Sequence, residues 1–206
     1  MKLNTILPAI VANAQLHAKW LNTLSLMENT GARKISASED TETVTYLILK
    51  HAAEEHRHAF YLKKQLEKLG ENLCSTYAAD YLLAPQDSKV YLNRLDLEVC
   101  RYLKTELGLN GKELRFAAYL LVTYAIEVRA DELYPIYQEF LSDAESKVNV
   151  KSIILEEEGH LEEMLNQLRQ FSPDWEIHAQ KAVTIETTLF ETWVESLEKE
   201  VLVDVG

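Results

Sequence analysis

Two short motifs in the chain place a glutamate and a histidine three residues apart. Glu55 precedes His58, and Glu157 precedes His160. In a helix, side chains three residues apart lie on the same face, so each pair can offer a carboxylate and an imidazole to one point. Carboxylates and imidazoles are ligands for divalent metals such as iron and manganese. Each motif therefore predicts half of a metal site.

Both motifs interrupt helical stripes that are otherwise mostly apolar, and two further stripes also carry a glutamate. Each stripe advances in steps of three or four residues, apart from two longer steps of seven residues, which is the pattern of a buried helix face. The four stripes are Val44, Ile48, His51, Glu55, His58, Leu62, Leu66 and Leu69; Val150, Ile153, Glu157, His160, Met164 and Phe171; Leu120, Tyr124, Glu127, Asp131, Tyr134 and Leu141; and His17, Leu21, Leu24, Glu28, Gly31 and Ile35.

Burial of these groups requires a compensating charge. An unpaired charge costs several kcal/mol to bury, whereas a whole domain is stable by only about 5–15 kcal/mol. The stripes contain no Lys or Arg, and two divalent cations would balance four carboxylates. The predicted metal ligands are Glu28, Glu55, His58, Glu127, Glu157 and His160.

The elements that must position these ligands are long helices. The chain has only 6 Gly and 4 Pro in 206 residues and no strand-like alternation. Expected helices cover about 6–35, 42–69, 111–141 and 144–170, with a turn at 36–41 and a bend at Pro135. A crossover carries a helix at about 89–107 that Gly108 closes, and a last helix covers about 175–201. The sequence predicts a single all-α domain, 1–206, with a core bundle at about 6–170.

In this arrangement the chain resembles the ferritin-like di-iron carboxylate superfamily, whose pattern is E…ExxH…E…ExxH. The resemblance covers residues 28–160 and implies an antiparallel four-helix bundle that binds two iron ions, or manganese or a mixed pair. It implies that Glu55 and Glu157 bridge the two metals and that Glu28 and Glu127 are terminal ligands. The two histidines bind one metal each.

The resemblance also suggests supporting residues. In many members an acid directly before each motif orients the opposite histidine, and Glu54 and Glu156 hold those positions, although most members have Asp there. His51 and Asp131 lie on the same faces and are further supporting candidates. Tyr124 is a candidate redox-active or substrate-orienting residue. A role in core packing is the simpler interpretation of His51, Asp131 and Tyr124.

Spacing indicates the branch of the superfamily. The interval between His58 and Glu127 is longer than a ferritin crossover and resembles that of oxygenases and oxidases, whose crossovers contain extra helices. Ala130 stands where rubrerythrins have a further Glu. The resemblance therefore implies an oxygen-dependent oxidase or oxygenase that acts on a small organic substrate. Its partners would be dioxygen and an electron donor such as a ferredoxin or a reductase.

Several alternatives remain open at this stage. The site could belong to a ferroxidase, to a peroxide-detoxifying protein, or to a non-catalytic metal-binding or storage protein. Glu54 or Glu156 could replace its neighbour as a ligand, because each precedes its histidine by four residues. The six residues could also be surface groups on helices of a different register. The sequence leaves a homodimer open.

Charge and cysteine content narrow the class of protein. The formal net charge of -12 disfavours binding to nucleic acids and to anionic membrane surfaces. Cys74 and Cys100 form no CxxC pair, which leaves a disulfide framework unsupported. The N-terminal segment lacks a signal-peptide core and no stretch approaches the length of a membrane span. We expect a soluble cytoplasmic protein.

Overall fold

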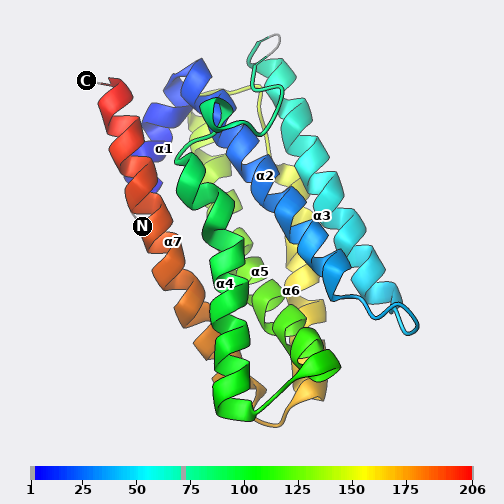
Figure 1. Ribbon diagram of the computed structural model, residues 1–206. Helices are drawn as coiled ribbons and strands as arrows, with labels where there is room; N and C mark the ends of the chain where they lie inside the picture. Colours follow the sequence, from blue (N-terminus) through cyan, green and yellow to red (C-terminus); the bar gives the residue numbers. More distant parts are fainter. Residues whose placement is uncertain (1–2, 71–72, 206) are drawn as a thin grey trace.

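The computed structural model describes residues 3–70 and 73–205, except for the side chains of residues 158 and 203–205. Over these residues the chain is helical and contains no strand (Figure 1). Short 3-10 turns, η1 (Leu66–Lys68) and η2 (Ala79–Tyr81), accompany the longer elements. The α-helices are α1 (Leu3–Ala12), α2 (Ala14–Ser38), α3 (Tyr46–Gln65), α4 (Pro85–Leu107), α5 (Gly111–Asp143), α6 (Lys151–Phe171) and α7 (Trp175–Val205).

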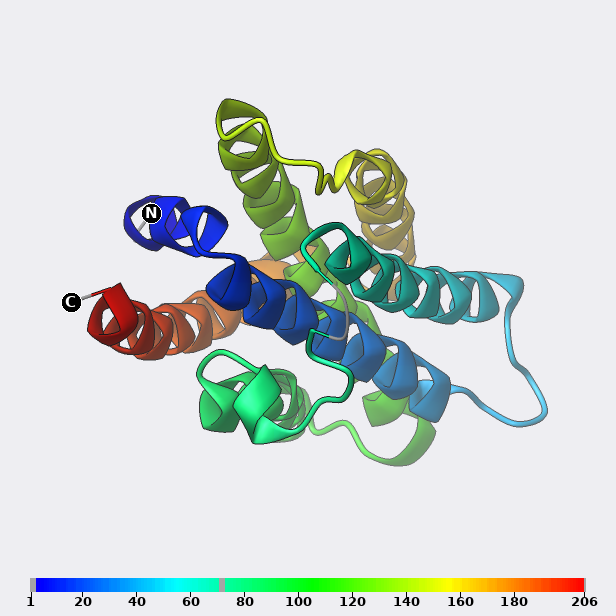
Figure 2. The ribbon, with the colours of Figure 1, turned by 90° about the horizontal axis from the view of Figure 1, so that it is seen from above.

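Two helical hairpins form the frame. A loop of a few residues joins α2 to α3, and another joins α5 to α6, so the helices of each pair run in opposite directions. α4 and α7 pack against α5 and against each other. Viewed from above, α1 lies beside the C-terminal part of α7 (Figure 2).

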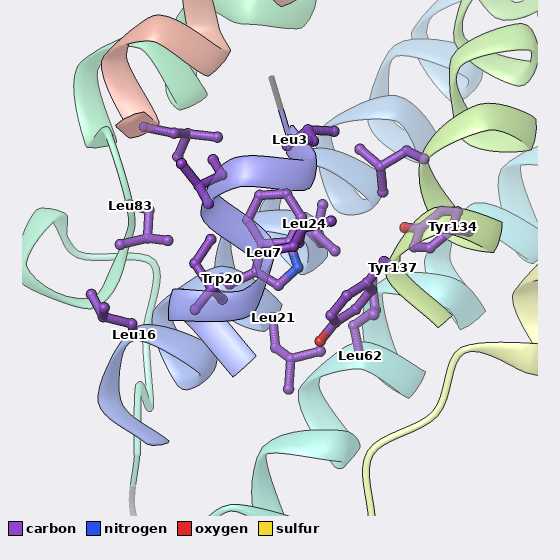
Figure 3. Packing of buried hydrophobic residues seen from close by; sticks show 14 of the residues in the cluster. Leu3, Leu7, Leu16, Trp20, Leu21, Leu24, Leu62, Leu83, Tyr134 and Tyr137 are labelled. Carbon is purple, nitrogen blue, oxygen red and sulfur yellow. The ribbon is translucent and has the colours of Figure 1, made fainter. Parts of the chain in front are cut away.

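Two apolar clusters fill the interior. One cluster joins α1 and α7 to the first half of α2 and the last part of α5; Figure 3 shows its centre, where Trp20 lies among Leu7, Leu24 and Tyr137. The other joins the second half of α2 and the first half of α3 to α4, α5 and α6. On each of α2, α3, α5 and α6, a predicted ligand lies between residues of the two clusters. A polar layer therefore separates two apolar regions.

The predicted first helix is wrong in one respect, because residues 6–35 do not form one helix. The chain breaks at Asn13, whose backbone is extended at φ -112° and ψ 112°. Its side-chain oxygen accepts hydrogen bonds from the backbone N–H groups of Gln15 and Leu16, at 2.9 and 3.2 Å. These bonds cap the N-terminus of α2 and stabilise the break.

Two other predicted helix starts lie too early in the sequence. The helix expected from 42 begins at Tyr46, since the hydroxyl of Thr45 caps it by accepting from the N–H of Ile48. The helix expected from 144 begins at Lys151. Before it, Glu145 adopts a positive φ of 48°, which ends the preceding helix at Asp143.

The remaining boundaries agree with expectation to within a few residues. α4 covers the predicted crossover helix and ends where Gly108 adopts φ 68°, the left-handed conformation of a helix C-cap. Pro135 lies inside α5, which continues to Asp143. Among the described helices, none combines the length and the apolar character needed to cross a bilayer.

Candidate metal centre

The six predicted ligands come together in the polar layer between the two apolar clusters. α2 contributes Glu28, α3 contributes Glu55 and His58, α5 contributes Glu127, and α6 contributes the Glu157 and His160 pair. Five of these side chains are buried, and Glu28 is half-buried. The alternative that these residues are surface groups is therefore wrong.

The ligand atoms fall into two overlapping groups, each held within 4.8 Å. One group contains Glu55, Glu127, Glu157 and His160, and the other contains Glu28, Glu55 and His58. Glu55 belongs to both groups. Glu157 also lies near both histidines, with Oε1 at 3.1 Å from Nδ1 of His58 and Oε2 at 3.5 Å from Nδ1 of His160. The geometry thus offers two adjacent positions that share carboxylates.

The outer nitrogen of each histidine is bound by an acid from the opposite helix. His58 Nε2 donates to Glu156 at 2.8 Å, and His160 Nε2 donates to Glu54 at 2.8 Å. This is the pairing that the resemblance implies. Arg57 makes ion pairs with both Glu54 and Glu156. These contacts direct Nδ1 of both rings toward the carboxylates, and they commit Glu54 and Glu156 away from the cluster.

The inner atoms of the cluster lack hydrogen-bond partners. Nδ1 of His58, Nδ1 of His160, Oε2 of Glu127 and Oε2 of Glu157 are buried and have none among the described residues. The 3.1 Å separation between His58 and Glu157 does not have hydrogen-bond geometry. Leaving such groups unpaired is costly. Nitrogen and carboxylate oxygen atoms that converge in this way fit a divalent cation such as iron or manganese.

The electrostatics of the cluster also indicate a need for positive charge. Burial, followed by neighbouring carboxylates, raises the pKa of Glu55 well above its usual range, and the same causes raise the pKa of Glu127. Burial opposes the ionisation of Glu157, but the close approach of Glu127 and of the two histidines holds its pKa below the usual range. Burial disfavours charged His160, yet Glu127 and Glu157 raise its pKa to about 11. Protons therefore compete with a cation for these ligands.

Tyr134 was not assigned to the site by the sequence analysis. Tyr134, seven residues after Glu127 on the same stripe, is buried and its hydroxyl donates to Oε1 of Glu28. Burial, then the charge of Glu28, raises the pKa of Tyr134 well above its usual range, so the phenol keeps its proton. The position of Tyr134 on the same helix face as Glu127 was the feature of the sequence that could have placed it at the site.

His51 supports the site from outside the ligand set. Both of its nitrogens have partners, since Nδ1 lies 3.1 Å from the hydroxyl of Tyr119 and Nε2 lies 2.9 Å from Glu163. Its ring packs against that of His160, with centroids 5.1 Å apart. Glu163 and Tyr119 were not expected at the site.

The structure does not bring Tyr124 or Asp131 to the cluster. Asp131 is exposed on α5. Tyr124 is half-buried and packs against the apolar cluster that includes Met164 and Leu168, and it is absent from the described lining of the cavity beside the ligands. In the described part of the chain, neither residue forms a hydrogen bond or an ion pair with the ligand set, so their expected roles gain no support.

A cavity of about 400 Å³ adjoins the cluster on one side. Glu28, Glu55 and Glu127 form part of its wall, whereas His58, His160 and Glu157 do not. Gly31 also lines it, and a Cβ at this position would lie 3.8 Å from Oε2 of Glu55. Most other lining residues are apolar side chains of α2, α4, α5 and α7. The cluster is therefore closed on its histidine side and open on its carboxylate side.

Comparisons with known proteins give no relative: no family model, no curated protein and no solved structure matches this chain.

Proposed function

We propose that this chain is a ferritin-like protein that binds two metal ions, iron in the first instance, and uses them to activate dioxygen for the oxidation of a small organic molecule. The observation that carries the proposal is the pair of overlapping ligand groups whose inner nitrogen and oxygen atoms have no partner. In this proposal, helices α2, α3, α5 and α6 would be the four helices of a ferritin-like bundle.

The chain's own residues define two metal positions. Glu55 is shared by both groups and would bridge them, and Glu157, which lies near both histidine Nδ1 atoms, would be the second bridge. Glu28 and Glu127 would each serve one position. Each of the two ions prefers six ligands. The six protein ligands would therefore leave coordination positions open on both.

The cavity supports an oxidase or oxygenase over a storage protein. When bound, two redox-active metal ions supply electrons that dioxygen requires. The protein restricts where that chemistry takes place, because hydrogen-bonded acids cover the histidine side and an apolar cavity lies on the carboxylate side. Apolar walls also limit access of water to the cluster. A site that only stored metal would not need a cavity of this size.

Dioxygen consumption tests the proposal. The protein is loaded anaerobically with Fe(II), mixed with air-saturated buffer, and followed with an oxygen electrode. Glu55→Ala should lower the rate by more than about a hundredfold, since groups outside a ligand set already account for 10–100-fold. Glu162→Ala, which removes an exposed carboxylate of α6, is the matched control.

Equal rates for Glu55→Ala and the wild type would contradict the proposal. Accumulation of ferric iron far beyond two ions per chain in a large hollow assembly would instead support storage. Continued oxidation of added Fe(II) beyond two ions per chain, with release of ferric iron, would support a ferroxidase.

A further inference from the structure

The cavity beside the ligand cluster is long for its volume. Its lining follows α5 from Gly111 to Tyr134 and α2 from Leu24 to Ser38. At a rise of 1.5 Å per residue these stretches measure about 34 and 21 Å. A volume of about 400 Å³ spread over such a length makes a slender space. It fits an extended chain better than a compact ring system.

One end of the cavity is open and the other is closed. The lining residues Ala37, Gly111 and Arg115, at the end of α2 and the start of α5, are exposed. At the opposite end, Leu133 and Trp193 are buried. We call these the mouth and the closed end. Glu127 lies between them, twelve residues after Arg115 and about 18 Å along the helix axis.

The charges along the cavity differ in how they are paired. Lys34 near the mouth forms an ion pair with Asp96 at 3.0 Å. Arg129, deeper inside, is held by Glu186 through two hydrogen bonds of 2.8 and 2.7 Å. Arg115 has no ion-pair or hydrogen-bond partner among the described residues. The uncommitted cation of the lining therefore stands at the mouth, where an anionic group of a ligand can reach it.

We propose that the cavity binds a slender apolar molecule with one anionic group, which lies at Arg115 while the apolar chain extends past Glu28, Glu55 and Glu127 toward Trp193. This inference rests on the proposed function, since that function makes the ligand a substrate. The carbon atom that lies next to the metal positions would then be remote from the anionic group. The apolar walls stabilise the chain by removing it from water, and the cation at the mouth sets its direction.

Brominated fatty acids test the direction of binding through tryptophan fluorescence. Hexadecanoate, whose extended chain is long enough to pass Glu127, is titrated into the protein as purified, followed by hexadecanoate with bromine at the carbon next to the carboxylate or at the far end of the chain. Contact with bromine quenches indole fluorescence. We expect stronger quenching by the far-end bromide, and loss of that difference in Trp193→Phe. No saturable binding, or stronger quenching by the bromide next to the carboxylate, would overturn the proposal.

Arg115 provides a second, independent test. Arg115→Gln should weaken binding of hexadecanoate by about two- to fivefold, the range of an exposed ion pair, and should leave binding of hexadecanol unaffected. Arg94→Gln removes an exposed arginine of α4 and should change neither the affinity for the acid nor that for the alcohol. Equal weakening of the acid and the alcohol by Arg115→Gln would contradict a role for its charge.

Failure of this proposal can be told apart from failure of the proposed function. The fluorescence titrations need no metal, whereas the oxygen measurements need no fatty acid. A protein that binds Fe(II) and consumes dioxygen but gives no saturable titration would lose the ligand assignment alone.

Discussion

Two regions of the interior contain buried histidines, and these histidines differ in their hydrogen-bond partners. In the apolar cluster near α1, His17 shares a hydrogen bond of 2.6 Å with the hydroxyl of Tyr137, and burial lowers its pKa to about 4. In the polar layer, His58 and His160 are bound only at Nε2, and Nδ1 of each has no partner among the described residues. The first histidine is neutral and buried in an apolar environment, whereas the other two direct a free nitrogen at carboxylates.

Buried carboxylates show the same contrast. Glu186 is 1% exposed, yet Arg129 binds both of its oxygens and Tyr91 donates to it as well. Glu127 and Glu157 are almost as buried, and each has one oxygen without a partner. The comparison teaches that burial alone does not identify a ligand. What distinguishes the candidate site is that the protein supplies no partner for atoms that converge.

The largest loss of stability is expected at Glu186, whose negative charge the protein itself balances with Arg129. Glu186→Gln removes the carboxylate that neutralises Arg129 and leaves a largely buried guanidinium without its main partner. We expect a loss of about 3 kcal/mol in the free energy of unfolding, as for other broken buried pairs. Urea unfolding of the metal-free protein measures it. A loss below about 1 kcal/mol would show that the pair does not stabilise this region.

His17 should make the protein sensitive to acid. Its pKa is about 4 in the folded chain and 6.5 in the unfolded chain, so between these values only the unfolded state binds the proton. Stability should therefore fall as pH decreases from 6.5 to 4, by about 3 kcal/mol from this residue. The slope of the unfolding free energy against pH should be smaller in His17→Gln. Equal slopes for the two proteins would contradict the assignment.

Supporting acids should affect metal binding less than the ligands do. Glu54→Gln weakens the hydrogen bond that directs Nδ1 of His160 toward the cluster. We expect a loss of about 10–100-fold in metal affinity, measured by competition with a coloured chelator. Asp131→Asn, at an exposed position on α5, should not change the affinity. An effect of Asp131→Asn as large as that of Glu54→Gln would contradict the placement of both residues.

The smallest change in stability is expected for Glu127→Gln, which is the same substitution as Glu186→Gln but lies in the candidate site. Burial and the charge of Glu157 raise the pKa of Glu127 well above its usual range, which favours its neutral form, and Glu127→Gln keeps a neutral group of similar shape. The unfolding free energy of the metal-free protein should change by less than about 1 kcal/mol. A loss as large as that of Glu186→Gln would mean that the two carboxylates are held in the same way.

The ligand cluster was predictable from spacing because its residues interrupt apolar helical faces. The stripe on α5 did not show on which side of Glu127 the cavity lies. At 100° per residue, Tyr124 and Asp131 are rotated from Glu127 by about 60° and 40° in one direction, and Ala130 by about 60° in the other. The cavity lies on the side of Ala130. Tertiary packing decides this, and the period of a single helix cannot.

Helix ends were the least predictable part of the fold. Asn13 could be read as a surface residue within one long helix, but its side chain caps α2. Cap geometry depends on backbone angles that composition does not reveal, and competing cap residues occur within a few positions of each other. For that reason Thr45, and not a residue before position 42, is the N-cap of α3. The contacts that identify Glu186 as structural also join helices far apart in sequence.

Metal content after anaerobic equilibrium dialysis against Fe(II) tests the central claim most directly. The overlapping ligand groups predict two ferrous ions per chain in the wild type and in Glu162→Ala, and loss of bound iron in Glu55→Ala, because Glu55 belongs to both groups. A wild-type protein that retains no iron, or a Glu55→Ala variant that still retains two ions, would contradict the account.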